Sequence, residues 1–426
     1  MDLKSEERGQ ESGVLKSKEN QQIGAHSSTN APTSAETEVE EESIPTALTS
    51  AYPPNLVHGE KFQWIDFDNP LLRRDCPLPL YPHVNMIGAP VHKGQPKNGT
   101  QYGPSLIRNS DIVEFLKTIG VTLVDHGDIA IENDDHLEPK AFNMVNCYSF
   151  IESTCTIAKR VEELLKESNS GVNGKHRRDS PLLVVGGDHS IATGTILGHK
   201  RVKPDACVIW IDAHADLNTP LTSSSGNMHG MPVAFLMEEL QEEVPYMKEM
   251  DPIEPCLKAR EIAYIALRDL DPHEVYDLRK NNITHFTMVD IDRMGIEWVV
   301  NKAIEAVNPR LEKPIHLSFD IDAMDPTLAP STGTTVPGGL TIREGLRICE
   351  MVHSTGKLSV MDLAELNPKI GSQVDVDRTK HTAITLLKAC FGYRRSGHLP
   401  FKVHSLSDHG IVSRADRQTS CQTQCI

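Results

Sequence analysis

The sequence predicts an α/β fold, in which three layers (α/β/α) surround a mostly parallel sheet of about eight strands. Eight short runs are apolar at successive positions, a pattern typical of strands buried on both faces of a parallel sheet. Amphipathic segments such as 148–166 and 342–355 separate many of these runs and predict helices. This alternation favours strands in the middle layer and helices on both sides.

The expected strands follow one another between stretches bounded by Gly, Pro or Asp, which end regular structure. In chain order they cover residues 84–87, 121–124, 182–185, 207–211, 262–266, 286–289, 315–319 and 358–361. Ligands of such sheets bind at the carboxyl ends of the strands. The residues that directly follow each run are therefore the first candidates for a functional site.

The chain has 426 residues, enough for one large α/β domain with polar ends. Residues 1–50 consist mainly of Glu, Ser, Lys, Gln and Thr, with too little apolar surface to offset the entropy of ordering. We expect a mostly disordered extension over 1–80, one domain over 81–400 and a tail over 401–426. The polar stretch 166–180 is expected to form a surface loop.

Composition excludes several classes of function. A formal net charge of −16 argues against nucleic-acid binding, which depends on clustered Lys and Arg. No run reaches the roughly 18 apolar residues of a membrane span. The first residues match neither a signal peptide nor a transit peptide, and nine cysteines without a CxxC spacing suit a reducing compartment. We therefore expect a cytoplasmic protein.

Metal-binding side chains follow the run 207–211. Asp212, His214 and Asp216 are spaced two apart, so in an extended segment their side chains face the same way. The same spacing recurs in Asp320 and Asp322 after the run 315–319. A lone Asp-x-His or Asp-x-Asp is weak evidence, because such pairs are more often loop or capping residues.

A third group follows the run 182–185, where two glycines allow a tight turn before His189. Crowded carboxylates repel one another unless a cation neutralises them. Six ligands dominated by oxygen exceed one tetrahedral zinc site and favour two divalent ions such as manganese. The predicted ligands are His189, Asp212, His214, Asp216, Asp320 and Asp322. Two such ions can bridge a water and lower its pKa, giving hydroxide at neutral pH.

These motifs resemble those of the arginase (ureohydrolase) family, in the order in which they occur there. They are Gly-Gly-Asp-His-Ser at 186–190, Asp-Ala-His-Ala-Asp-Leu-Asn at 212–218 and Ser-Phe-Asp-Ile-Asp-Ala-Met-Asp-Pro at 318–326. The resemblance extends over about 85–397. It implies an arginase-like fold, two manganese ions per subunit and hydrolysis of a guanidinium group to urea and an amine.

The resemblance also assigns roles to single residues. The six residues above match the family's manganese ligands, and Asp216 would in addition hydrogen-bond the bridging hydroxide. His229 matches a residue that passes a proton to the leaving amine, which suits the near-neutral pKa of histidine. Glu365 matches the carboxylate that pairs with the substrate guanidinium, whose parallel N–H groups a carboxylate accepts.

Related enzymes act on arginine, agmatine, guanidinobutyrate or formiminoglutamate, so the metal motifs do not select the substrate. The segment 218–227 resembles the loop that receives the α-carboxylate of arginine. Its amide and hydroxyl donors Asn218, Ser225 and Asn227 suit that anion. Asp271 matches the acid that accepts the α-ammonium group, and the expected substrate contacts also include Glu274 and Thr334. L-arginine is favoured, with ornithine and urea as products, and agmatine is the alternative.

The family is often trimeric, and Arg343, Glu344 and Arg395 match positions used at that interface. A homotrimer is therefore expected. The motifs argue against three other classes of protein. A two-metal phosphoesterase would need a later Gly-His-x-His motif, a one-zinc deacetylase would not need all these aspartates, and a binding protein of this fold would have lost ligands or His229.

Overall fold

The computed structural model describes residues 79–131, 138–169 and 180–395, and these form the predicted α/β fold. The eight strands make one sheet in the order β2-β1-β3-β8-β7-β4-β5-β6, and every pairing is parallel. Their bounds are β1 His83–Ala89, β2 Thr122–Asp128, β3 Leu182–Gly186, β4 Cys207–Ile211, β5 Ile262–Leu267, β6 Thr284–Thr287, β7 Ile315–Asp320 and β8 Leu358–Ala364. The predicted fold class is confirmed.

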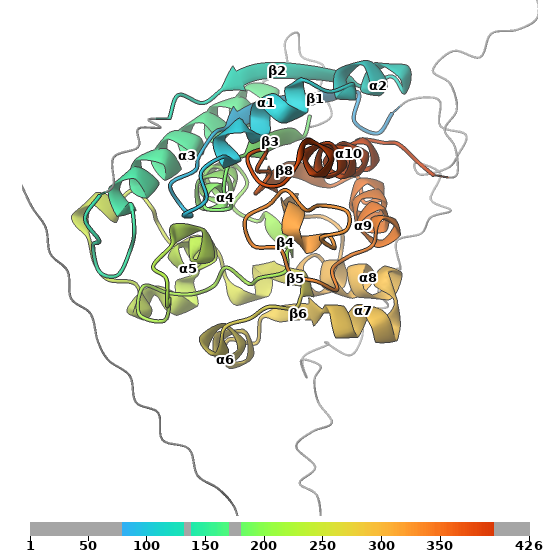
Figure 1. Ribbon diagram of the computed structural model, residues 1–426. Coiled ribbons are helices and arrows are strands. Elements are labelled where there is room, and N and C mark those ends of the chain that lie inside the picture. Colours follow the sequence, from blue (N-terminus) through green and yellow to red (C-terminus); the bar gives the residue numbers. More distant parts are fainter. Residues whose placement is uncertain (1–78, 132–137, 170–179, 396–426) are drawn as a thin grey trace, which may run out of the picture. The chain divides into compact units, whose positions relative to one another are not determined.

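Helices cover both faces of the sheet, and Figure 1 shows α3 to α5 on one side and α8 to α10 on the other. The α-helices are α1 Gly103–Arg108, α2 Ile112–Thr118, α3 Cys147–Asn169, α4 Ile191–Val202, α5 Pro232–Leu236, α6 Pro272–Lys280, α7 Met288–Met294, α8 Ile296–Val307, α9 Ile342–Ser354 and α10 Gln373–Cys390. Short 3-10 helices lie at Thr100–Tyr102, Met228–Gly230, Glu238–Glu243, Lys248–Met250, Ala259–Glu261 and Ile321–Ala323.

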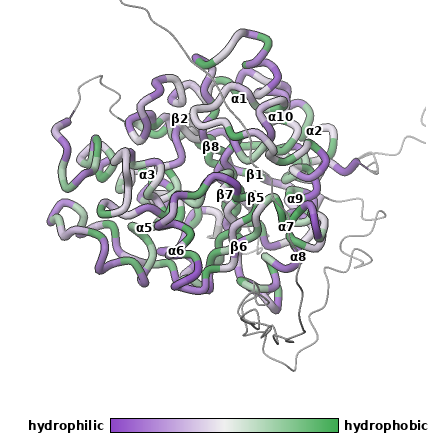
Figure 2. Tube along the Cα trace, turned by 60° about the horizontal axis from the view of Figure 1, so that its bottom comes forward, coloured by the Kyte–Doolittle hydropathy of each residue, from purple (hydrophilic) through white to green (hydrophobic). Residues whose placement is uncertain are grey.

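Alternate residues of the central strands pack into apolar clusters on the two faces of the sheet. In β4, Cys207, Ile209 and Ile211 pack with α8 and α9, whereas Val208 and Trp210 pack with α4 and α5. The helices in Figure 2 change between apolar and polar colours along their length, as expected when one side of a helix contacts the sheet. Burial on both faces fixes the register of the central strands, and with it the positions of the residues that follow them.

The two edge strands differ from the prediction. Thr287 ends β6 and caps α7, accepting a hydrogen bond from the Asp290 amide, so Met288 and Val289 are helical rather than extended. The β2 strand begins one residue later than predicted and continues to Asp128, and most of its side chains are exposed. An edge strand lacks one neighbour and is only partly covered by helices, so its residues need not be apolar.

The helix prediction for 148–166 is nearly correct, but α3 continues to Asn169, three residues beyond the expected end of the helix. The rest of the expected loop 166–180, except Ser180, lies outside the described residues, as do residues 1–78 of the predicted extension and the tail 401–426. Within the described ranges, no helix combines the length and the apolar character that crossing a membrane requires.

Candidate metal centre and active site

The predicted site residues lie at the carboxyl ends of neighbouring strands. The strands β3, β8, β7, β4 and β5 are consecutive in the sheet, and each is followed by at least one candidate residue. His189 follows β3, Glu365 follows β8, Asp212 follows β4 and Asp271 follows β5. Because all these strands are parallel, their ends meet at one edge of the sheet.

One group of metal-binding atoms surrounds the buried imidazole of His189. Its Nδ1 atom lies 3.0 Å from Asp212 Oδ2, 3.2 Å from Asp216 Oδ2 and 3.2 Å from Asp320 Oδ2. An imidazole nitrogen carries at most one proton, so a hydrogen bond satisfies only one of these oxygens. A cation between the four atoms would interact with all of them.

A second group lies beside the first. His214 Nδ1 is 3.3 Å from Asp212 Oδ1 and 3.3 Å from Asp322 Oδ2. Asp212 therefore belongs to both groups, with one carboxylate oxygen directed to each imidazole. This arrangement suits two cations that share one bridging carboxylate.

The protonation of the carboxylates supports this interpretation. Burial, together with repulsion from Asp212, raises the pKa of Asp216 to about 6. Burial and the nearby charges of Asp322 and Asp212 raise the pKa of Asp320 well above its ordinary value. Crowding carboxylates in a buried place is unfavourable, and divalent cations would remove the repulsion. The donor set of carboxylate oxygens and imidazole nitrogens fits manganese or a similar divalent ion.

His229 and Glu365 form a pair beside the metal-binding groups. The Glu365 Oε1 atom accepts a hydrogen bond from the His189 amide at 2.9 Å and lies 3.1 Å from His229 Nδ1. Its Oε2 atom is buried and has no hydrogen-bond partner among the described residues. Burial lowers the pKa of His229, but the hydrogen bond and charge of Glu365, together with the charges of Asp216 and Asp188, outweigh burial and raise the pKa to about 9.

Backbone strain marks two of these residues. Asp216 has φ of 50° and Glu365 has φ of 62°, in the left-handed region that residues other than glycine rarely adopt. Such conformations cost free energy, persist where the surroundings enforce them and are concentrated at functional sites. In both cases the turn follows a strand and directs a carboxylate toward the centre described above.

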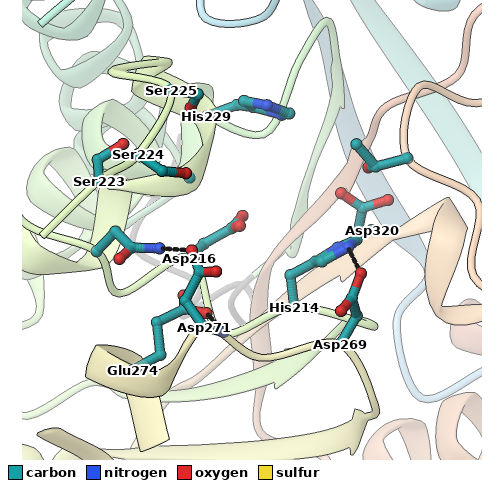
Figure 3. A pocket seen from close by; sticks show the side chains of 13 residues that line it. His214, Asp216, Ser223, Ser224, Ser225, His229, Asp269, Asp271, Glu274 and Asp320 are labelled. Atoms are coloured by element: carbon teal, nitrogen blue, oxygen red, sulfur yellow. Dashed lines mark hydrogen bonds and ion pairs between the residues drawn. The ribbon is translucent and has the colours of Figure 1, made fainter.

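A cavity of about 180 Å³ opens above the metal-binding groups. Figure 3 shows the serine segment 223–225 together with Asp271 and Glu274 on one side, and His214 with Asp320 on the other. The lining residues are His214, Asp216, Asn218, Ser223, Ser224, Ser225, His229, Gly230, Asp269, Asp271, Glu274, Asp320 and Thr334. A polar molecule with a cationic end would meet acidic and hydroxyl groups throughout this cavity.

The predicted substrate-binding residues form a network at the cavity wall. Asn218 Nδ2 donates to Asp271 Oδ2 at 2.9 Å, and Glu274 accepts from the backbone amides of Leu217 and Asp271. Burial raises the pKa of Glu274 to about 7, although these two amides lower it. Thr334 lies on the opposite side, where its hydroxyl donates to Asp322 Oδ2 at 2.8 Å.

The predicted contact Asn227 does not itself line this cavity, but its amide donates to Ser225 Oγ, which does. Sequence reasoning missed three further neighbours of the site. The Trp210 ring stacks on His189 with 4.2 Å between ring centroids, and its indole N–H donates to Asp212. Asp188 accepts hydrogen bonds from the Gly94 and Ser190 amides. Asp269 Oδ2 lies 3.8 Å from His214 Nε2. The available signals were the position of Asp188 inside the 186–190 motif and that of Asp269 two residues before Asp271.

Comparisons with known proteins agree with the motifs. The profile of the arginase family matches residues 82–392. Arginase-1 of Sus scrofa is 43% identical over 317 residues, which cover 74% of this chain and 94% of the relative. The mitochondrial arginase-2 of Homo sapiens is 43% identical over 320 residues, covering 74% and 86%. The structure of Entamoeba histolytica arginase in complex with L-ornithine aligns with a TM-score of 0.63 and 29% identity, covering 74% of this chain and 99% of that one.

Proposed function

The chain belongs to the arginase family, and we propose that it hydrolyses L-arginine to L-ornithine and urea with two manganese ions per subunit. The observation that carries the proposal is the sharing of Asp212 between two carboxylate–imidazole groups under a cavity rich in acids. This arrangement suits water attack on a cationic substrate group. Relatives named arginase support the assignment of the reaction.

His189, Asp212, Asp216 and Asp320 would hold one cation, and His214, Asp212 and Asp322 the other. When bound, the two cations lower the pKa of a water between them, which makes it a nucleophile at neutral pH. Asp216 is suited to accept a hydrogen bond from the attacking water. Its strained backbone keeps the carboxylate directed into the cavity floor.

Glu365 is suited to orient the guanidinium group of the substrate. Among residues 79–131, 138–169 and 180–395 its Oε2 atom has no hydrogen-bond partner, whereas Oε1 is held by the His189 amide and by His229. A buried carboxylate oxygen attracts a cationic N–H donor strongly. The substrate carbon would then face the attacking water at a fixed distance, which lowers the entropic cost of reaction.

His229 is suited to transfer a proton to the leaving amine. Since Nδ1 is engaged by Glu365, Nε2 is the ring atom left for this transfer. The raised pKa of about 9 keeps the ring protonated at neutral pH. When water adds to the guanidinium carbon and the bond to the side-chain nitrogen breaks, that nitrogen takes up the proton and leaves as the amine of ornithine.

The other end of the cavity favours an α-amino acid. Asp271 would accept the α-ammonium group, helped by Glu274 behind it. Hydroxyl and amide donors of the 218–227 segment would bind the α-carboxylate. Agmatine lacks this carboxylate and would leave the donors without a partner. The ornithine complex of a 29% identical arginase is consistent with an amino-acid ligand in this fold.

The proposal is tested by measuring urea release from arginine and from agmatine by the manganese-loaded protein at equal concentrations. We expect arginine to have the higher kcat/KM. A preference for agmatine would overturn the substrate assignment and leave the metal centre intact. The Asp216→Ala variant should release no urea and retain less manganese; undiminished activity would contradict the mechanism.

We also propose that the enzyme is a homotrimer with Arg343, Glu344 and Arg395 at its contacts. Arg395 pairs with Glu350 of its own chain through two hydrogen bonds, of 3.0 and 2.9 Å, which holds its guanidinium at the surface. Arg343 is exposed at the start of α9. Light scattering of the Arg395→Ala variant should give a lower mass than the wild type.

The cellular compartment of the enzyme is a further part of the proposed function. We propose a cytoplasmic enzyme, with the mitochondrion as the alternative because one relative is named mitochondrial. Fluorescence microscopy of the full-length chain tagged at its C-terminus distinguishes the two.

A further inference from the structure

A row of buried polar side chains continues from the metal centre into the protein along β7. His316, Ser318 and Asp320 alternate with residues that pack in the apolar core of the opposite face. Both His316 and Ser318 are completely buried, and Ser318 lies directly opposite Asp362 in the pairing of β7 with β8. The proposed mechanism uses neither Ser318 nor Asp362, although burying such groups is costly without a compensating role.

Asp362 is the centre of this row. Its Oδ2 atom accepts hydrogen bonds from Thr195 Oγ1 at 2.6 Å and Ser318 Oγ at 3.3 Å, and lies 2.8 Å from His316 Nε2. A carboxylate carries no proton and acts only as an acceptor. Each of the three neighbours must therefore direct a hydrogen toward Asp362.

The direction of these bonds determines the tautomer of His189. Ser318 has one hydroxyl proton, which it donates in the hydrogen bond to Asp362. The oxygen of Ser318 can then only accept from its other neighbour, His189 Nε2, at 2.9 Å. A neutral His189 therefore carries its proton on Nε2, and Nδ1 keeps a lone pair. That lone pair faces the three aspartate oxygens at 3.0 to 3.2 Å.

We propose that Asp362 is a positioning residue for the metal centre, which acts through Ser318 to hold His189 in the tautomer that binds a cation at Nδ1. Without this carboxylate, the Ser318 hydroxyl is free to donate to His189 Nε2. His189 could then carry its proton on Nδ1, in the place that a cation would occupy. The inference rests on the proposed metal centre but not on the identity of the substrate.

The experiment compares manganese retention in the wild type, Asp362→Ala, Ser318→Ala and the double variant. Each full-length protein is loaded with manganese and dialysed against graded chelator, and bound metal is measured by atomic emission. We expect each single variant to lose about 10- to 100-fold in affinity, as is usual for residues that orient metal-bound histidines. The double variant should lose no more manganese affinity than Ser318→Ala alone, because Asp362 acts on His189 through Ser318.

Thr195→Val is the matched control, because the Thr195 hydroxyl bonds the same oxygen of Asp362 and the Ala192 carbonyl, whereas Ser318 bonds both Asp362 and His189. Its manganese affinity should stay within about twofold of the wild type, since the hydrogen bonds from Asp362 through Ser318 to His189 stay intact. Asp362→Asn can keep an oxygen facing Ser318 and should recover most of the affinity lost in Asp362→Ala. If Asp362→Ala does not fold, the comparison of Ser318→Ala with Thr195→Val still tests whether manganese affinity depends on the Ser318 hydroxyl between Asp362 and His189.

Wild-type retention in Ser318→Ala or in a folded Asp362→Ala, or additive losses in the double variant, would overturn the inference. These results are distinct from failure of the proposed function. A wild-type protein that binds no manganese would refute the metal centre itself, and one that binds manganese but hydrolyses no arginine would refute only the reaction.

Discussion

His229 and Glu365 lie 136 residues apart in sequence, yet their side chains meet with 3.1 Å between Nδ1 and Oε1. The Glu365 Oε2 atom has no hydrogen-bond partner among the described residues, and His229 contacts Glu365 through Nδ1. In the proposed mechanism, this pair joins the proton donor to the carboxylate that accepts the guanidinium.

Replacing Glu365 with Gln should lower kcat/KM for arginine at least about thirtyfold, because losing one partner of a buried charged pair costs about 2–5 kcal/mol. The Gln side chain can still accept from the His189 amide, so the fold should persist. Steady-state kinetics with a circular dichroism control check this. A Gln variant with wild-type kcat/KM would show that Glu365 does not bind the guanidinium.

Asp212 contributes one oxygen to each metal-binding group, so Asp212→Ala should lose both cations. His214→Asn touches one group and should leave about one cation bound instead of two. Metal analysis after gel filtration measures the stoichiometry. Chelator treatment of the wild type should abolish urea release and added manganese should restore it. Equal metal content in the two variants would argue against a bridging role.

Ser225→Ala should raise KM for arginine about tenfold or more, since a hydrogen bond to a charged group contributes about 1.5–3 kcal/mol. KM for agmatine should not change, because agmatine has no carboxylate to lose a donor. Parallel kinetics with the two substrates give the comparison. If both KM values rose by the same factor, Ser225 would act on the loop and not on the carboxylate.

His353 predicts a pH-dependent component of stability. Burial lowers the pKa of His353 to about 4, while its backbone hydrogen bond to Cys390 acts in the opposite direction. In the unfolded chain the pKa of His353 is near 6.5. Between this pH and about 4, the His353 ring is therefore protonated in the unfolded state but stays neutral in the folded state. Stability should fall as pH drops from about 6.5 to 4, by about 3 kcal/mol at 1.36 kcal/mol per pKa unit.

Urea unfolding between pH 4 and 7 tests this for the wild type and His353→Gln, which should lack that component. His381→Gln, at an exposed position, is the control and should follow the wild-type curve. Identical slopes for the wild type and His353→Gln would contradict the assignment. Other groups titrate in all three proteins. The contribution of His353 is therefore the difference between the wild-type and His353→Gln curves of unfolding free energy against pH.

Gly187 lies in the turn between β3 and His189, where an added Cβ would come within 1.8 Å of the Val91 carbonyl oxygen. Backbone atoms cannot move aside easily, so Gly187→Ala should destabilise the fold by about 1–3 kcal/mol or more. At Gly230 a Cβ would meet no atom within 4 Å, and Gly230→Ala should melt near the wild-type temperature. Thermal unfolding of the two variants measures the contrast.

Much of the fold was readable from the sequence because the central strands are buried on both faces and are mostly apolar. Where the sheet ends, this signal weakens. At Phe286 the run passes without a break into α7, and only the cap at Thr287 marks the boundary. The polar residues His316 and Ser318 sat inside a run interpreted as apolar, and their role depends on neighbours from other elements.

The sequence by itself indicated which residues are candidates to bind metal, because each group follows a strand and alternation in an extended segment turns 212, 214 and 216 the same way. Only the tertiary structure decided that Asp212 serves two groups, that Glu365 meets His229 and that Asp362 connects through Ser318 to His189. The physical reason is the order of the strands. Parallel pairing brings together side chains that are far apart along the chain, and local periodicity carries no information about which strands become neighbours.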